Sequence, residues 1–245
     1  MKIKDIYNIF ANHSEAQWIM QPYNAQLLYK FVKEHNIKKV LDLGTGIGAS
    51  AAIIALALKD KGEKDFHIDT VEHLDKCINL AKKLIPDELK ENITFHKSEV
   101  DIIQFEKIPY QHFSVYSDIP EGDYDLIIND GPPPVFMGEC WVDLPNGTIM
   151  RMLLDGKIKP GAFVAFDGRL HMLKFLERYY SDNFYLARPA QKGDDLNILE
   201  RKDNPPHFND AKLEAMRQSS YFKDYENTNS SNIKTPSGTS EASHQ

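Results

Sequence analysis

Short apolar runs alternate along the chain with stretches of helical, amphipathic character. Seven runs predict strands, at 39–43, 66–72, 92–96, 123–129, 161–167, 183–188 and 195–201. The stretches between them predict helices at 48–60, 74–84, 98–106, 138–155 and 170–181. Alternation at this spacing favours a parallel sheet with helices on both faces.

The last two predicted strands are not separated by a helix. Residues 187–195 join them, and a connection this short permits a hairpin but not a parallel crossover. The predicted fold class is therefore α/β, with a doubly wound, mostly parallel seven-stranded sheet that ends in a C-terminal antiparallel hairpin.

Flanking segments divide the rest of the chain. Before the first strand we expect a helical cap, interrupted at Pro22, with a helix from about Tyr23 to His35. A polar and aromatic insertion is expected at 107–122. The expected divisions are an N-terminal cap over the sheet edge and pocket mouth (1–36), the main domain (37–202), a helical extension (203–226) and a disordered tail rich in Ser, Thr and Asn (227–245).

Composition excludes several classes of protein. The formal charge is −7 with no long basic block, which disfavours an extensive nucleic-acid surface. Cys77 and Cys140 lie in unrelated segments and indicate neither a disulfide framework nor a zinc site. Residues 1–20 lack the apolar region of a signal peptide, and no stretch approaches the roughly 18 apolar residues of a membrane span. We expect a cytoplasmic protein; the oligomeric state is not predicted.

The most informative segment is a glycine turn between the first strand and the first helix after it. Gly44, Gly46 and Ala49 match the dinucleotide pattern G-x-G-x-x-G/A, while Asp42 to Gly48 match D-x-G-x-G-x-G in full. A carboxylate two residues before the first glycine would repel a diphosphate. It would suit a ligand that carries a cationic amino group and a sulfonium.

The D-x-G-x-G-x-G run resembles motif I of the class I S-adenosylmethionine (SAM) dependent methyltransferases. The resemblance implies that SAM is the cofactor and that its methionine part lies over the turn, with Asp42 near its amino group. The positions implied to bind SAM around the turn are Asp42, Gly44, Thr45, Gly46 and Gly48.

Two further strand ends match the cofactor positions of this family. Glu72 closes the second predicted strand, where a carboxylate can accept two hydrogen bonds from a ribose diol. Ser98 and Glu99 follow the third strand and resemble the Gly-Asp-Ala position that meets the adenine edge. Ser98 and Glu99 replace the usual Gly and Asp, and Glu99 would also suit the start of a helix.

Candidate catalytic residues follow the fourth and fifth strands. Asp130, in Asn-Asp-Gly-Pro-Pro-Pro, resembles the Asp-Gly-Pro-Pro segment of a group of small class I methyltransferases, and by that resemblance it lies where the methyl group points. Asp167 ends the next strand on the same rim, and His171 lies one turn into the following helix as a candidate general base. Arg169 could recognise an anionic acceptor, and Tyr116 could form a pocket wall or belong to the core.

A metal at this rim is not favoured. Some metal-dependent O-methyltransferases hold a divalent cation on acids at the two strand ends that Asp130 and Asp167 occupy. In those enzymes Asn or Asp usually follows the second acid, whereas Gly168 follows Asp167 here. The expected activity is SAM-dependent methylation of a small-molecule or glycan acceptor, at oxygen. An NAD(P)-dependent oxidoreductase and a catalytically inactive SAM-fold binding subunit remain alternatives.

Overall fold

A computed structural model describes residues 1–137 and 140–217. These residues fall into two compact units, Met1–His207 and the part of Phe208–Gln245 up to residue 217. Within the second unit one helix is described, α8 (Asp210–Arg217). The predicted disordered tail at 227–245, like the end of the predicted extension 203–226, lies outside the described residues.

The first unit is built on a seven-stranded sheet with the strand order β10-β11-β9-β6-β1-β2-β3. All neighbouring strands are parallel except at β11, which is antiparallel to both β9 and β10. The predicted mostly parallel sheet with an antiparallel C-terminal hairpin is thereby confirmed. The strands are β1 (Lys39–Leu43), β2 (His67–Glu72), β3 (Ile93–Lys97), β6 (Leu126–Asn129), β9 (Phe163–Asp167), β10 (Phe184–Arg188) and β11 (Leu196–Arg201).

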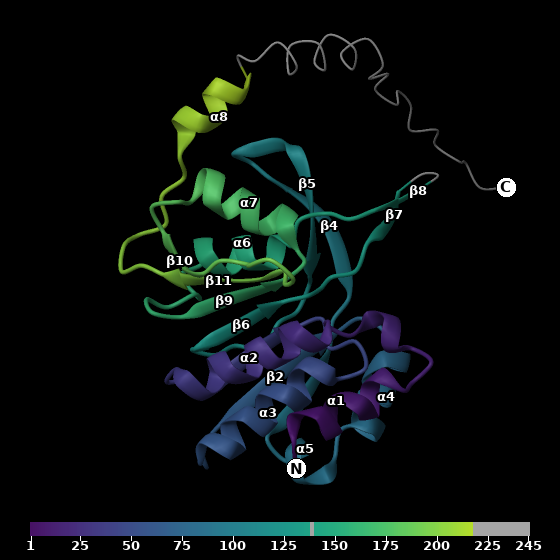
Figure 1. The fold of residues 1–245 in the computed structure, drawn as a ribbon. Coiled ribbons are helices and arrows are strands. Elements are labelled where there is room, and N and C mark those ends of the chain that lie inside the picture. Colours follow the sequence, from purple (N-terminus) through teal and green to yellow (C-terminus); the bar gives the residue numbers. More distant parts are fainter. Residues whose placement is uncertain (138–139, 218–245) are drawn as a thin grey trace, which may run out of the picture. The chain divides into compact units, whose positions relative to one another are not determined.

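Helices cover both faces of this sheet, with α2 and α3 on one side and α6 and α7 on the other (Figure 1). The helices of the first unit are α1 (Ile3–Ala11), η1 (Ala16–Trp18), α2 (Pro22–Glu34), α3 (Ala49–Lys61), α4 (Asp75–Leu84), α5 (Asp87–Lys90), α6 (Gly147–Leu154) and α7 (Leu170–Tyr179). Pro22 stands at the first position of α2, where its missing N–H costs no hydrogen bond. No helix among the described residues is long and apolar enough to cross a membrane.

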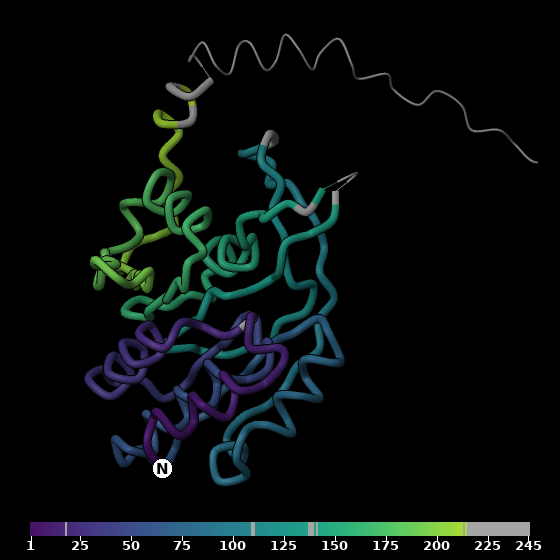
Figure 2. Tube along the Cα trace, turned by 45° about the vertical axis from the view of Figure 1, so that its right-hand side comes forward, coloured from purple at the N-terminus to yellow at the C-terminus, as the bar shows by residue number. Residues whose placement is uncertain are grey.

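Helix α3 is the centre of one face of the core. Every residue from Ala49 to Leu58 is buried, because the sheet lies on one side and α1 and α2 lie on the other. Its many alanines let these neighbours approach closely. Figure 2 shows the purple N-terminal segment against the blue segment that holds α3. The glycine turn is therefore the start of a helix that cannot move without disturbing the core.

A β-hairpin replaces the helix that the sequence predicts at 98–106 and the insertion predicted at 107–122. Strands β4 (Val100–Phe105) and β5 (Ile108–Tyr116) pair antiparallel across a two-residue connection. The hairpin is anchored on the other face of the core, where the Phe113 ring packs edge-on against Phe175 of α7 with ring centroids 5.2 Å apart. Short apolar runs such as Val100–Phe105 do not distinguish strand from helix by periodicity alone, so pairing decided the outcome.

The predicted helix at 138–155 is also shorter than expected. Strand β8 (Cys140–Val142), which pairs with the preceding strand β7 (Val135–Met137), lies in its first part, and α6 begins only at Gly147. Pro145 precedes the cap residue, and the Asn146 side chain caps the helix by accepting a hydrogen bond of 2.9 Å from the Thr148 N–H. Because Pro145 and the Asn146 cap set the start of α6, the helix begins later than the predicted residue 138.

The two ends of α3 give a matched test of the packing at the glycine turn. Gly48 and Gly62 both have positive φ, of 96° and 86°. A Cβ at Gly48 would lie 2.9 Å from the side chains of Ala81 and Ile85, whereas one at Gly62 would meet nothing within 4 Å. We expect Gly62→Ala to cost about 1–2 kcal/mol for the left-handed backbone, and Gly48→Ala to cost about 1–3 kcal/mol more from overpacking. Urea unfolding of both variants measures this difference, and equal losses would contradict it.

Candidate active site

The carboxyl ends of β1, β2, β6 and β9 open into one cavity of about 720 Å³. Volumes in this range are typical of small-molecule sites. The side chains around it are rich in acids. Its lining consists of Glu15, Gln17, Ile19, Gly44, Gly46, Glu72, His73, Leu74, Lys76, Cys77, Tyr116, Asp130, Gly131, Pro133, Pro134, Asp167 and Arg169.

Gly44 packs against the turn that follows β6. Its φ is 106°, and a Cβ added there would lie 2.6 Å from the Gly131 nitrogen. A Cβ at Gly131 would in turn lie 2.8 Å from the Gly44 Cα. The two glycines thus let the turns after β1 and β6 lie back to back, so Gly44 serves the protein's own packing as well as the cavity wall.

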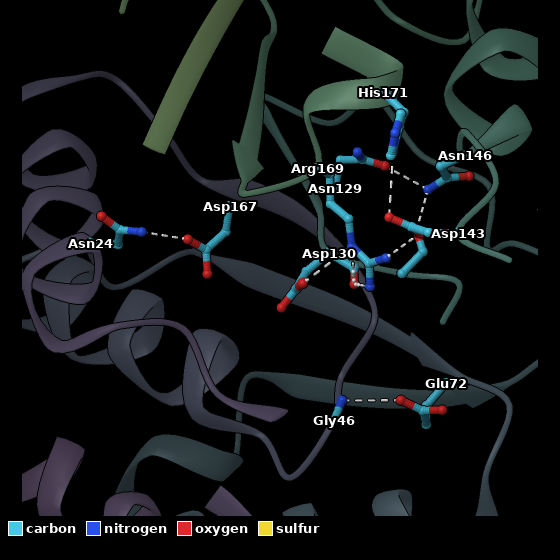
Figure 3. Close-up of polar contacts among 11 residues, drawn as sticks. Asn24, Gly46, Glu72, Asn129, Asp130, Asp143, Asn146, Asp167, Arg169 and His171 are labelled. Carbon is cyan, nitrogen blue, oxygen red and sulfur yellow. Dashed lines mark hydrogen bonds and ion pairs between the residues drawn. The ribbon is translucent and has the colours of Figure 1, made fainter. Parts of the chain in front are cut away.

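Glu72 bridges two of the turns that form the cavity (Figure 3). Its Oε2 accepts a hydrogen bond of 3.0 Å from the Gly46 N–H, and its Oε1 accepts one of 2.8 Å from the His73 N–H. Burial raises the pKa of Glu72, but the His73 ring and the N–H groups of Leu74 and Gly46 outweigh burial, so the pKa lies below its ordinary value. The Gly46 N–H of the glycine turn therefore donates its hydrogen bond to a charged carboxylate.

Asp42 lies beneath the cavity and is not part of its lining. The residue is 0% exposed, and its Oδ2 accepts hydrogen bonds from Ser50 Oγ at 2.8 Å and Thr70 Oγ1 at 3.0 Å. Its Oδ1 has no partner among the described residues. Burial raises the pKa of Asp42 to about 7, against the opposing hydrogen bonds. The structure places Asp42 behind the cavity wall, and its predicted position near the amino group of the cofactor remains a prediction.

Asp130 is held in place by Arg169, which comes from the loop after β9 (Figure 3). The Arg169 Nε donates a hydrogen bond of 3.1 Å to the Asp130 carbonyl and lies 3.6 Å from its carboxylate, while Nη1 donates to Asp143 at 3.0 Å. Burial raises the pKa of Asp130 well above its ordinary value, and the Arg169 charge opposes this. Because Arg169 is occupied by these two acids, it supports Asp130 and does not stand free for an anionic acceptor.

Asp167 ends β9 on the same rim and is bound by an amide from α2. Asn24, which is 1% exposed, donates through its Nδ2 to Asp167 Oδ1 at 2.6 Å and to Asp195. Burial raises the pKa of Asp167 to about 6; the Asn24 hydrogen bond lowers it and the Asp195 charge raises it. Asp167 is thus an acid in the cavity wall that titrates near neutrality.

The remaining predicted site residues lie away from the cavity lining. Thr45 is buried, with its hydroxyl 2.5 Å from Thr70 Oγ1, and Gly48 packs against α4. Ser98 is 2% exposed and accepts a hydrogen bond of 2.9 Å from the Asp118 N–H. Glu99 is exposed on the surface. For these four residues contact with a cofactor remains a prediction.

His171 does not face Asp130 or Asp167. Its side chain is 65% exposed, and its Nδ1 lies 3.4 Å from the Asp143 carboxylate on the far side of Arg169 (Figure 3). The imidazole is not part of the lining of the large cavity, and its role as general base remains a prediction.

Sequence reasoning missed two groups in the lining and left the place of a third undecided. One wall comes from the segment between α1 and α2, where Glu15 lies 2.5 Å from Lys76 of α4. A second comes from His73 and Leu74 after β2, and a third from Tyr116 at the end of β5. The predicted N-terminal cap over the pocket mouth could have indicated the first group. For Tyr116 the sequence left the pocket wall and the core as alternatives, because the hairpin that carries it was expected to be a helix and a loop.

Within the described residues, no group of three or more His, Cys, Asp or Glu side chains is arranged to hold a metal ion. Asp130 and Asp167 both line the cavity, but Arg169 neighbours the first and Asn24 binds the second.

Comparisons with known proteins agree with this architecture. Residues 5–122, just under half of the chain, match the family model of protein-L-isoaspartate(D-aspartate) O-methyltransferases. The fold is similar to the SAH-bound methyltransferase PaMTH1 of Podospora anserina (TM-score 0.56, 13% identity, 82% of this chain and 88% of that one). It is also similar to the O-methyltransferase TomG of Streptomyces achromogenes in complex with SAM (TM-score 0.54, 13% identity, 82% of this chain and 89% of that one).

The fold is that of the class I SAM-dependent methyltransferases. An O-methyltransferase of Bacillus cereus in complex with SAH shares the fold as well (TM-score 0.50, 14% identity, 82% of this chain and 90% of that one). The family match ends at residue 122, before Asp130 and Asp167. The match therefore covers the glycine turn and Glu72 and does not extend to the turns after β6 and β9.

The raised pKa of Asp42 predicts a pH-dependent cost in stability. Between pH 3.8 and about 7 the folded protein keeps a proton that the unfolded chain has released, so the contribution of Asp42 to stability falls as the pH rises through this window. The free energy of unfolding of Asp42→Asn, relative to that of wild type, should therefore rise by on the order of 4 kcal/mol between pH 4 and pH 8, at about 1.4 kcal/mol per pKa unit.

Urea unfolding at a series of pH values tests this expectation. Asp65→Asn, a substitution on the exposed surface, is the matched control and should show no such trend. A difference between Asp42→Asn and wild type that is constant across pH would mean that Asp42 does not carry a shifted pKa.

Proposed function

We propose that this methyltransferase binds SAM across the glycine turn and methylates an oxygen atom of a small-molecule or glycan acceptor. The observation that carries the proposal is the acidic cavity, in which Glu72 already accepts the Gly46 N–H. Acids of this kind suit a cofactor that brings positive charge. When bound, SAM supplies a methyl group on a positively charged sulfur.

The same observation argues against a dinucleotide cofactor. Diphosphate sites use free backbone N–H groups at a helix start. Here the Gly46 N–H is bonded to Glu72, whose negative charge would repel a phosphate. Two strong cations of the lining are paired with acids, Lys76 with Glu15 and Arg169 with Asp143. An NAD(P)-dependent oxidoreductase is therefore the weaker reading of this turn.

Three parts of the chain would hold the cofactor. Gly44 and Gly46 provide the floor beneath its aminoacyl part, and Glu72 offers carboxylate oxygens to the ribose hydroxyls. Asp42 contributes its charge from below without contact. Asp130 lies at the end of β6 beside Gly131, on the acceptor side of the turn.

Asp167 is the best candidate for the general base. A hydroxyl acceptor must lose its proton as the new C–O bond forms and the C–S bond breaks, and a carboxylate can take that proton. Asp167 lines the cavity, and its pKa of about 6 keeps it ionised at neutral pH while leaving it basic enough to act. Asp130, whose pKa burial raises, would position the acceptor by hydrogen bonding.

A second candidate acceptor is favoured by the family match over residues 5–122. Members of that family are named for methylating isoaspartate, which also receives the methyl group on oxygen. The reactions differ in their products: an ether resists alkali, whereas a methyl ester releases methanol. Tritiated methyl transfer to catechol, to a methyl glycoside and to an isoaspartyl peptide would separate the two. Transfer to the peptide alone would replace our proposal with the second.

Cofactor choice is tested by calorimetry of the full chain with SAM, S-adenosylhomocysteine (SAH) and NADH. We expect micromolar binding of the first two and none of NADH, because the lining repels phosphate. Tight binding of NADH without SAM would establish the oxidoreductase. Binding of SAM with no transfer to any acceptor would favour the catalytically inactive subunit.

The role of Asp167 is tested by the pH dependence of turnover with the acceptor found above. We expect the rate to rise through about pH 6, as the carboxyl loses its proton. Asp167→Asn should lower kcat by about 10²–10⁴-fold, the usual contribution of a general base, and leave the Kd of SAH unchanged.

Two neighbours of Asp167 provide controls that shift the profile in opposite directions. Asn24→Ala removes the hydrogen bond that lowers the pKa of Asp167, so the midpoint should move to higher pH. Asp195→Asn removes the charge that raises it, so the midpoint should move lower. Both variants should keep the plateau rate. Profiles that do not move would remove Asp167 from the proton transfer.

A further inference from the structure

Tyr116 places an unsatisfied hydroxyl at the cavity. It is the last residue of β5, it is 0% exposed, and it belongs to the cavity lining. Its hydroxyl has no hydrogen-bond partner among the described residues. Leaving a buried polar group unpaired costs about 1–3 kcal/mol. A group that is kept at this cost beside a cavity indicates a ligand.

The position of the hydroxyl is fixed by the fold around it. The Tyr116 N–H donates a hydrogen bond of 2.9 Å to Thr148 Oγ1 at the start of α6, and Arg151 of the same helix donates to the Tyr116 carbonyl. At Gly131 the space that a Cβ would need is taken by the Tyr116 hydroxyl. The hairpin therefore delivers this hydroxyl to the point where the turns after β1 and β6 meet.

Negative charge surrounds the hydroxyl. Burial raises the pKa of the Tyr116 phenol well above its ordinary value, and the carboxylates of Glu72, Asp130 and Asp42 raise it further, against Arg169. The phenol is thus neutral at neutral pH and keeps lone pairs on its oxygen. Among three acids, the group that suits such an oxygen is a cation that can donate hydrogen bonds.

We propose that the Tyr116 hydroxyl oxygen accepts a hydrogen bond from the ammonium group of the cofactor's aminoacyl arm. This inference rests on the proposed function, because SAM and SAH both carry that ammonium. The ionised carboxylate of Glu72 supplies the attraction, and Tyr116 supplies the contact. The role is one of binding; Tyr116 takes no part in moving the methyl group or the proton.

The variant Tyr116→Phe tests the inference, because it removes the hydroxyl and keeps the ring. The probes are SAH and 5′-methylthioadenosine, which has the ribose and adenine of SAH but no amino acid arm. We expect the Kd of SAH to rise at least about 10-fold, as for the loss of a hydrogen bond to a charged group. The Kd of 5′-methylthioadenosine should change less than about 2-fold, within the error of comparing related variants. The Tm of the ligand-free variant should equal or exceed that of wild type.

Tyr124→Phe is the matched control. The Tyr124 hydroxyl has partners, donating to Asp69 Oδ2 at 3.1 Å and to the Pro120 carbonyl at 3.2 Å, and it is not part of the lining. Its removal should lower the Tm of the ligand-free protein and leave the Kd of SAH unchanged. The two substitutions thus have opposite effects on stability and on binding.

Each outcome decides between specific statements. Equal losses for SAH and 5′-methylthioadenosine would place the hydroxyl on the nucleoside and overturn the inference. So would an unchanged Kd for SAH, which would leave the hydroxyl to water, or a fall in the Tm of ligand-free Tyr116→Phe. Wild-type protein that binds neither SAM nor SAH would instead contradict the proposed function.

Discussion

The hydrogen bond from the Gly46 N–H to Glu72 is the interaction on which the site depends. It joins the turn after β1 to the end of β2 at 3.0 Å, and it puts a carboxylate where a phosphate-binding protein would leave a free amide. The bond fixes the shape of the cleft and its charge together. Both properties follow from one side chain that is 5% exposed and ionised.

Three further acids, Asp42, Asp130 and Asp167, lie near this bond in surroundings that disfavour their charged forms. Burial raises the pKa values of Asp42, Asp130 and Asp167 against hydrogen bonds or cations that lower them. Such groups oppose folding at neutral pH and are typical of functional sites. Arg169 and Asn24 limit the cost by binding Asp130 and Asp167. A cofactor that brings positive charge would relieve the repulsion that remains.

The strands of the sheet and its mostly parallel class could be predicted from sequence because apolar runs alternate with helical stretches at a regular spacing. Gly44, Gly46, Glu72, Asp130 and Asp167 could be placed because the carboxyl ends of parallel strands meet at one edge. The buried position of Asp42 could not be predicted. It depends on hydrogen bonds from Ser50 and Thr70 to the Asp42 carboxylate, and Thr70 lies 28 positions away in the sequence.

The hairpin explains most of what the sequence left out. Val100–Phe105 reads equally as a short helix or a strand, and only its pairing with Ile108–Tyr116 resolves the ambiguity. Tyr116 then depends on Thr148, which lies 32 positions further along the chain. The surroundings of His171 could not be predicted for a similar reason, because its ring lies beside Asp143, which also binds Arg169 and is distant in the sequence.

The most direct measurement is a crystal structure of the full chain with SAH. The account predicts the ribose hydroxyls on the Glu72 carboxylate and the aminoacyl arm over Gly44 and Gly46, with no displacement of Glu72 from the Gly46 amide. A ligand seated elsewhere, or a Glu72 side chain pushed away from the turn, would contradict the claim that this carboxylate selects the cofactor.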